Sequence, residues 1–371
     1  MIKQLGSTLR EEARNFYQVD LGSVVAAACL AHDIGNPSFG HSGEAAISTY
    51  FLEQANVSLQ GETLANHFNK AEWQDLTHFE GNANALRILT HHYGNRQKGG
   101  FQLTYTTLAS IVKYPGESLA GDGKTLLTKK YGFFQSELAA FAEIASVLQM
   151  PRLQENPLLY QRHPFVFLVE AADDICYRVI DWEDAHRLGI IESGTAIELL
   201  FNLLKALRRE NMDRIQNILD ALGNDPREQL AFLRAQCINY LVIHCAEVFM
   251  NNEKALLTGR YNRSLLEGID DEARQALDAI NQVTIRKIYN HETVVRIELA
   301  GYEVMRSLLS AFIPAVLSPA PSHKDKKLLQ LLPAQYRLAG TGAYEKALSV
   351  IDFVAGMTDS YAMELYKNLR G

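Results

Sequence analysis

The segments AIELLFNLLKAL, residues 196–207, and LAFLRAQCINYL, residues 230–241, carry apolar side chains at intervals of three and four residues. This spacing puts those side chains on one face of an α-helix, so each segment predicts an amphipathic helix that buries that face. The chain has only 10 prolines, which leaves such periodic windows largely uninterrupted. The sequence therefore predicts an all-α fold. The apolar positions are Ala196, Leu199, Leu200, Leu203, Leu204 and Leu207, and Leu230, Leu233, Cys237, Tyr240 and Leu241.

Similar periodicity extends over most of the chain, and strands are expected to be minor. Clusters of glycine and proline predict loops at 35–40, 94–100, 114–132 and 313–322. Neither an internal repeat nor a sharp change of composition divides the sequence into independent domains. The expected helices include those near 8–18, 21–33, 79–93, 163–187, 193–222, 226–251 and 291–312.

Composition excludes several classes of protein. The 36 basic and 43 acidic side chains leave a net charge of −7, and 47% of the 371 residues are hydrophobic. This much apolar material suits a packed core and excludes a disordered chain. The mild acidity argues against a protein that coats nucleic acid. The longest uncharged apolar stretch, residues 21–31, is shorter than the roughly 20 residues that a membrane-spanning helix needs.

The N-terminal residues contain no apolar core of a signal peptide, so we expect a soluble, non-secreted protein. Its four cysteines lie in apolar helical patterns and form no CxxC pair. This arrangement suits buried thiols in a reducing cytoplasm better than a disulfide framework. The cysteines are Cys29, Cys176, Cys237 and Cys245.

The first segment with chemical potential is CLAHDIGNPSFGHSGEAAI, residues 29–47. Here an apolar helix ends in His32 and Asp33, and a loop leads to His41 and Glu44. An adjacent histidine and aspartate can offer one nitrogen and one oxygen ligand to a divalent ion. The alternative is that this pair only caps helix ends.

The second such segment is FVFLVEAADDICYRVIDWEDAHR, residues 165–187. Asp173, Tyr177 and Asp181 recur at intervals of four, so they share one face of the predicted helix. The apolar residues before Asp173 predict that its carboxylate is buried, and a buried carboxylate needs a cation or several donors. The ordinary alternative is a solvated face for the aspartates and a core position for the tyrosine.

Two other chemistries are rejected on the sequence. Gly123, Lys124 and Thr125 end like a P-loop, but Ser118 occupies the first glycine position and no alternating strands and helices surround the segment. A cysteine nucleophile is also unsupported, because none of the four cysteines has a basic residue nearby in its apolar setting.

Together, the pair His32-Asp33 and the distant Asp173 resemble the HD phosphohydrolase superfamily. Five further segments are similar, in order, to the deoxyguanosinetriphosphate triphosphohydrolase family and span nearly the whole chain. They are HDIGNPSFGHSGEAAI (32–47), LTHFEGNANALRIL (76–89), KYP (113–115), IELAGYEVM (297–305) and FVAGMTDSYA (353–362).

One feature departs from the family pattern. The family's first metal-ligating histidine lies in a segment resembling RLTHSLEV, some tens of residues before the HD pair, whereas residues 1–31 contain no histidine. We therefore expect that the chain lacks the segment that carries this ligand or has lost the ligand itself. Either case would weaken the metal site.

The resemblance implies an HD-domain core over residues 1–190 and a helical C-terminal part over 191–371. It implies hydrolysis of a deoxynucleoside triphosphate (dNTP), dGTP first, to deoxynucleoside and tripolyphosphate. A divalent ion of the Mg, Mn, Ni or Fe class would be held by His32, Asp33 and Asp173.

The resemblance also implies roles for other residues. His41, supported by Glu44, would handle protons, either at the attacking water or at the leaving 5′-oxygen, with His78 near the phosphates. Lysines would neutralise the phosphates, and tyrosines and carboxylates would contact sugar and base. The expected substrate-binding residues are Lys113, Lys129, Lys130, Tyr177, Asp181, Tyr289 and Glu298.

Two alternatives remain at this point. An HD-like scaffold without its first histidine could bind nucleotides or another protein as a regulator without turnover. Another HD activity, such as a nucleotide phosphodiesterase, uses the same ligands but is disfavoured by the EGN, KYP and GMTD segments. By resemblance we also expect a homo-oligomer, namely a hexamer, and an effector that is single-stranded DNA or a dNTP. No membrane partner is expected.

Overall fold

The computed structural model describes residues 15–59, 61–93, 100–207, 212–223, 225–337 and 342–370. The chain divides into two compact units, of which the first comprises Met1–Val25 and Pro164–Val295 and the second Ala26–His163 and Arg296–Gly371. Two helices, α3 (Leu21–Ala31) and α15 (Glu292–Leu317), continue from one unit into the other along the chain. The predicted boundary at residue 190 stays a prediction.

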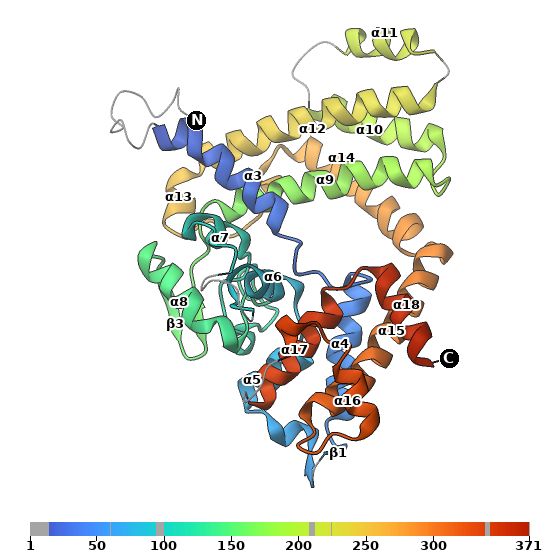
Figure 1. Cartoon of the computed structure of the whole chain (residues 1–371). Coiled ribbons are helices and arrows are strands. Elements are labelled where there is room, and N and C mark those ends of the chain that lie inside the picture. The colour runs from blue at the N-terminus through green and yellow to red at the C-terminus, as the bar shows by residue number, and fades with distance from the viewer. Residues whose placement is uncertain are drawn as a thin grey trace. The chain divides into compact units, whose positions relative to one another are not determined.

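The first unit is a helical bundle in which α10 packs against α12 and α14, and α9 packs against α12 (Figure 1). Its core is the apolar faces that the sequence spacing predicts, and Leu200, Leu204 and Leu233 are fully buried. Its helices are α9 (Val166–Arg187), α10 (Ser193–Leu207), α11 (Asp213–Ala221), α12 (Pro226–Asn251), α13 (Glu253–Leu257) and α14 (Asp271–Val283), with π-helical turns at Phe16–Asp20 and Thr284–Tyr289 and a 3₁₀ turn at Leu266–Gly268.

Local sequence explains where α12 begins. Asp225 precedes it, and its side chain accepts hydrogen bonds from the backbone N–H groups of Arg227 and Glu228. Pro226 occupies the first turn, where its missing N–H leaves no donor unsatisfied. Aspartate before proline is therefore a start signal that adds to the apolar periodicity.

The second unit is also helical and contains two short antiparallel hairpins. The hairpins are β1 (Ser58–Leu59) with β2 (Glu62–Thr63), and β3 (Arg152–Glu155) with β4 (Leu158–Tyr160). The helices are α4 (His41–Gln54), α5 (Lys70–Thr77), α6 (Gly81–Thr90), α7 (Tyr105–Ile111), α8 (Leu138–Val147), α16 (His323–Leu329), α17 (Ala343–Ala355) and α18 (Asp359–Arg370), with 3₁₀ turns at Leu64–His67, Ser118–Ala120, Gln135–Glu137 and Ala334–Tyr336.

The core of the second unit joins α4 and α5 to α15 and α17, which lie more than 200 residues later in the sequence. Ile47 and Phe51 of α4 are fully buried, as are Phe312 and Ile313 of α15. Burying four such side chains contributes roughly 1.5–3 kcal/mol each before the entropic cost of folding. The N-terminal motif segment is thus fixed to the C-terminal part of the chain.

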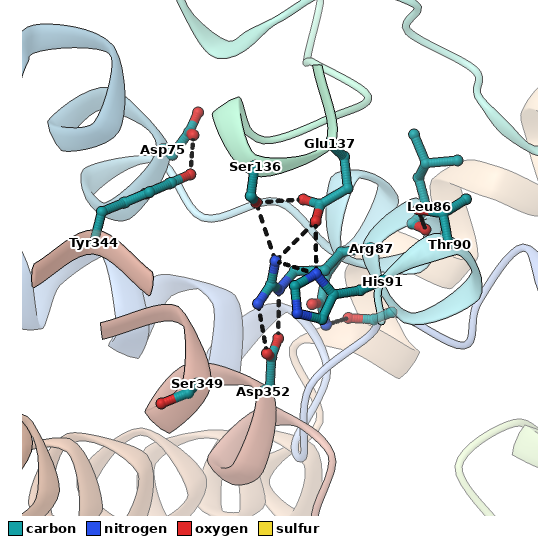
Figure 2. Close-up of polar contacts among 12 residues, drawn as sticks. Asp75, Leu86, Arg87, Thr90, His91, Ser136, Glu137, Tyr344, Ser349 and Asp352 are labelled. Carbon is teal, nitrogen blue, oxygen red and sulfur yellow. Dashed lines mark hydrogen bonds and ion pairs between the residues drawn. The ribbon is translucent and has the colours of Figure 1, made fainter. Parts of the chain in front are cut away.

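A buried ion cluster ties α6 to α17 within this unit (Figure 2). The guanidinium of Arg87 donates two parallel hydrogen bonds of 2.8 Å to Asp352. It also donates to Glu137 at 2.8 Å and to Ser136 at 3.0 Å. Arg87, Glu137 and Asp352 are each at least 95% buried. Because each buried charge has opposite charges as partners, the cluster is a specific link between the two helices.

The all-α prediction is confirmed, and the strands are minor. Helices expected near 163–187, 226–251 and 291–312 correspond to α9, α12 and α15. The helix expected over 193–222 is wrong as one element, because α10 ends at Leu207 and α11 begins at Asp213. Residues 208–211 lie outside the described residues, and Met212, which follows them, is in a turn. Residues 8–14 and 94–99 of the expected elements lie outside the described residues.

The four cysteines are free thiols, as expected. Cys237 and Cys245 are buried and Cys29 is partly so, but Cys176 is exposed, which corrects the expectation of a buried thiol there. The buried stripe of α9 runs through Ile175 and Val179, and Cys176 lies off that stripe. Among the described helices, none is long and apolar enough to cross a membrane.

Candidate active site

The end of α3 orients the predicted metal-binding histidine. The Nδ1 atom of His32 lies 2.7 Å from the carbonyl oxygen of Cys29. A carbonyl can only accept, so Nδ1 carries a proton, and in a neutral ring the lone pair would be on Nε2. That Nε2 lies 3.3 Å from a carboxylate oxygen of Asp33. One nitrogen and one oxygen ligand therefore lie side by side, with the histidine oriented from behind as metal ligands usually are.

The loop after Asp33 lies directly against the start of α6. A Cβ atom added to Gly35 would come within 2.1 Å of the backbone nitrogen of Ala85, so only glycine permits this approach. The side-chain amide of Asn84 donates to the carbonyl oxygen of Gly35 at 2.8 Å. Helix α6, which begins at the EGN segment, thus supports the loop that follows His32 and Asp33.

The same loop is held by two C-terminal segments, IELAGYEVM (297–305) and FVAGMTDSYA (353–362). Ser38 donates to the carbonyl oxygen of Met357 at 2.5 Å, and the N–H of Phe39 donates to Asp359 at 2.9 Å. Ser42 donates to the carbonyl oxygen of Glu298 at 2.6 Å. The GMTD and IELAG segments therefore support the loop that carries His41, which explains why segments so distant in sequence share one family pattern.

His41 and Glu44 lie in the first turn of α4. The His41 side chain is exposed, whereas Glu44 is half-buried and accepts a 2.7 Å hydrogen bond from the N–H of Gly81. Burial raises the pKa of Glu44, and the nearby carboxylate of Glu80 raises it further. Lys130, the Gly81 N–H and His41 oppose this shift without cancelling it. A partly desolvated carboxylate beside an exposed imidazole is an arrangement suited to proton transfer.

The sequence reasoning missed Glu80. It is 7% exposed, caps the start of α6, and accepts a 2.8 Å hydrogen bond from the ammonium group of Lys130. An acidic residue immediately before the Gly81-Asn82 helix start is the signal that could have found it. Its pairing with a lysine 50 residues later could not be read from local sequence.

The other predicted residues of this unit are more scattered. His78 follows the last residue of α5, is exposed, and has its Nδ1 3.0 Å from the hydroxyl of Thr77. Lys113 is half-buried, and its carbonyl oxygen accepts a 2.6 Å hydrogen bond from Arg162. Lys129 is exposed. Lys130 donates a 2.8 Å hydrogen bond to Glu80, and its charge acts on Glu44.

In the first unit, α9 is continuous from Val166 to Arg187, so Asp173, Tyr177 and Asp181 share a face as predicted. The rings of Tyr177 and Tyr289 lie 5.9 Å apart between centroids, inclined at 32°. Burial, followed by the charges of Asp184 and Asp173, raises the pKa of Asp181. The helix face and Tyr289 therefore form one group. That this group and the predicted residues of the second unit belong to a single site stays a prediction.

Comparison with known proteins gives the chain its class. The phosphohydrolase-associated domain family matches residues 268–368. With the His32-Asp33 pair and the helical fold, this match fits the HD superfamily.

Relatives extend the likeness over nearly the whole chain. A deoxyguanosinetriphosphate triphosphohydrolase-like protein of Synechocystis sp. is 38% identical over 374 residues, which cover 98% of this chain and 80% of that protein. One of Pseudomonas aeruginosa is 36% identical, covering 99% and 82%. A deoxyguanosinetriphosphate triphosphohydrolase of Yersinia enterocolitica is 28% identical, covering 99% and 85%. The chain belongs to the deoxyguanosinetriphosphate triphosphohydrolase-like family.

Proposed function

We propose that this protein hydrolyses deoxynucleoside triphosphates, dGTP first among them, at the α-phosphorus to give a deoxynucleoside and tripolyphosphate. The observation that carries the proposal is the first turn of α4. There the exposed His41 lies beside Glu44, whose carboxylate is fixed by the N–H of Gly81 at 2.7 Å. The names of the relatives support a triphosphate as substrate.

Proton transfer is assigned to His41. Its exposed ring can reach a bound ligand, and it lies in the same helical turn as a carboxylate with a raised pKa. Glu44 interacts electrostatically with the imidazole, and its carboxylate can orient the ring. The dyad can therefore hold a proton at the imidazole and deliver or remove it at the scissile P–O bond.

A divalent cation is proposed at His32, Asp33 and Asp173. The donor set fits, since the Nε2 atom of His32 lies 3.3 Å from an oxygen of Asp33. A nitrogen ligand together with carboxylate oxygens suits Mg, Mn, Ni or Fe ions. When bound, such an ion supplies Lewis-acid polarisation of a phosphate oxygen and a more acidic water. The chain's own part is to orient His32 through the Cys29 carbonyl.

Substrate contacts are proposed for both units. Lys113 and Lys130 would neutralise the negative charge of the phosphates as point cations. Lys129 would add a further positive charge from its exposed position. His78 would lie near the phosphates. The Tyr177–Tyr289 pair and Asp181 would contact the sugar and base, with Glu298 as a further polar contact.

A product assay tests this function. The purified protein is incubated with dGTP and Mn²⁺ or Mg²⁺, and anion-exchange chromatography separates tripolyphosphate from pyrophosphate and phosphate. Stoichiometric tripolyphosphate and deoxyguanosine are expected. Saturable dGTP binding without any product would instead support a regulatory nucleotide-binding protein.

Replacing Asp173 by alanine is expected to weaken Mn²⁺ binding by at least about tenfold, or roughly 1.4 kcal/mol, because one anionic ligand is lost. Equilibrium dialysis with Mn²⁺ alone, read by elemental analysis, measures this directly. Asp184→Ala is the matched control, since Asp184 is an exposed aspartate of the same helix. Equal Mn²⁺ binding by the Asp173 variant would remove Asp173 from the site.

Replacing Tyr177 by alanine is expected to shrink the preference for dGTP over GTP, measured as the ratio of kcat/KM values, by at least about tenfold. The proposed reason is that the ring packs against the C2′ edge of the sugar and leaves a 2′-hydroxyl neither space nor a partner. Tyr177→Phe keeps the ring and should keep the preference. An unchanged ratio in Tyr177→Ala would return Tyr177 to a packing role against Tyr289.

We propose further that the protein is a cytoplasmic homo-oligomer, a hexamer by resemblance to its family, with single-stranded DNA or a dNTP as effector. Light scattering at several protein concentrations tests the assembly. A monomeric mass throughout would contradict it.

A further inference from the structure

Glu80, at the start of α6, lies beside the proposed catalytic pair. Glu80 is 7% exposed, so the negative charge of its carboxylate must be met by donors or a cation. The side-chain amide of Asn82 donates to Oε1 at 2.6 Å, and the ammonium group of Lys130 donates to the same oxygen at 2.8 Å. These two partners and its position at the helix start fix the carboxylate in one place.

Lys130 gains a defined position from this contact. A lysine side chain is long and loses rotamer entropy when held, so it stays in place only where a partner offsets that cost. Lys130 is 31% exposed and paired, whereas the adjacent Lys129 is exposed to solvent. The reactivity of Lys129 therefore serves as the reference against which the reactivity of Lys130 can be measured in the same protein.

The start of α6 also acts on Glu44. Gly81, which follows Glu80, donates its N–H to Glu44 at 2.7 Å. The charges of Glu80 and Lys130 both act on the Glu44 carboxylate, in opposite directions. Two carboxylates and one ammonium group thus form a single charged cluster at the start of α6.

We propose that Glu80 is a positioning residue that holds the Lys130 ammonium group beside Glu44. Its importance for turnover rests on the proposed function, because Lys130 is there a phosphate ligand and Glu44 supports His41. The pairing itself does not depend on activity and can be measured in an inactive protein.

The first test measures the pairing. Wild type, Glu80→Gln and a control are briefly treated with an acylating reagent, and mass spectrometry gives the labelling of Lys130 relative to Lys129. Glu80→Gln keeps size and polarity but removes the charge, so the ratio should rise at least about fivefold, or roughly 1 kcal/mol of lost pairing. Glu53 of α4 forms an exposed ion pair with Arg306 of α15. Glu53→Gln removes this pair and should leave the labelling ratio unchanged. An unchanged ratio in a folded Glu80→Gln protein overturns the proposal.

The second test measures coupling in turnover. Glu80→Gln and Lys130→Met should each lower kcat/KM for dGTP by about tenfold, and the double variant should be no worse than Lys130→Met alone. Additive losses would show that Glu80 acts independently of Lys130 and would overturn the proposal. Absence of tripolyphosphate release by wild type would instead contradict the proposed function, and the labelling ratio would still decide the pairing.

The pH profile gives a readout that a merely structural role would not move. The charged and donor groups that act on Glu44 are Glu80, Lys130, His41 and the Gly81 N–H. Glu80 raises the pKa of Glu44 by more than Lys130 lowers it. Glu80→Gln should therefore let Glu44 ionise at lower pH even when Lys130 is released, and the acidic limb of kcat/KM should move to lower pH. A uniform loss at every pH would mark a structural role only and contradict the proposal.

Discussion

Replacing His41 by alanine is expected to lower kcat by about 10²–10⁴-fold, with the dissociation constant for dGTP nearly unchanged, as is usual when a proton-transfer group is removed. His41 is the exposed member of the first turn of α4, and the neighbouring Glu44 is anchored by the N–H of Gly81. The imidazole can therefore act on a ligand while its carboxylate partner stays fixed.

Glu44→Ala should give a smaller loss in the same direction, and the double variant should resemble His41→Ala alone, because both residues act through one imidazole. His323→Ala is the matched control, since His323 is an exposed histidine at the start of α16. Rapid-quench kinetics and dGTP binding are measured separately. A loss of affinity equal to the loss of kcat would mark His41 as a binding residue instead.

Replacing Arg87 by methionine is expected to lower the free energy of unfolding by about 3–5 kcal/mol, because two buried carboxylates lose their cation. Arg87 donates to both oxygens of Asp352 and to Glu137, and all three side chains are at most 2% exposed (Figure 2). Methionine preserves much of the volume, so the effect reports the charge. Urea unfolding followed by circular dichroism measures it.

Arg306→Met is the control for this prediction. Arg306 forms an ion pair with Glu53 in which both side chains are more than one-third exposed, and such pairs typically contribute about 0–1 kcal/mol. A loss for Arg87→Met no larger than for Arg306→Met would contradict the account of the buried cluster.

The pH dependence of stability has a defined sign at Glu137. Burial alone would raise its pKa, but Arg87, with hydrogen bonds from His91 and Ser136, holds the pKa below its ordinary value of 4.5. A carboxyl with a lowered folded-state pKa stabilises the fold above its ordinary pKa, and that contribution is lost as the pH falls through the lowered value. Acid below pH 4.5 should therefore weaken wild type progressively.

Local sequence was sufficient for much of the fold. The three-four spacing in α10 and α12 predicted helices whose faces are buried. It was insufficient where the apolar period weakens, so α10 and α11 were predicted as one helix. The expected helix at 79–93 is shorter, because α6 begins after Glu80 and ends at Thr90.

The candidate site divides in the same way. His41 and Glu44 were predictable because motif and contact lie within one turn. The role of Glu80 depends on Lys130, and the support from Met357 and Asp359 comes from more than 300 residues away. Such contacts arise only from tertiary packing, which periodicity and short motifs do not encode.

Attack on the α-phosphorus is the central claim, and hydrolysis of dGTP in ¹⁸O-enriched water tests it most directly. If water attacks the α-phosphorus and the bond to the 5′-oxygen breaks, the label enters a terminal phosphate of tripolyphosphate, and deoxyguanosine carries none. ³¹P NMR and mass spectrometry of the two products detect the label. We predict labelled tripolyphosphate and unlabelled deoxyguanosine, whereas pyrophosphate with dGMP, or label in the nucleoside, would contradict the account.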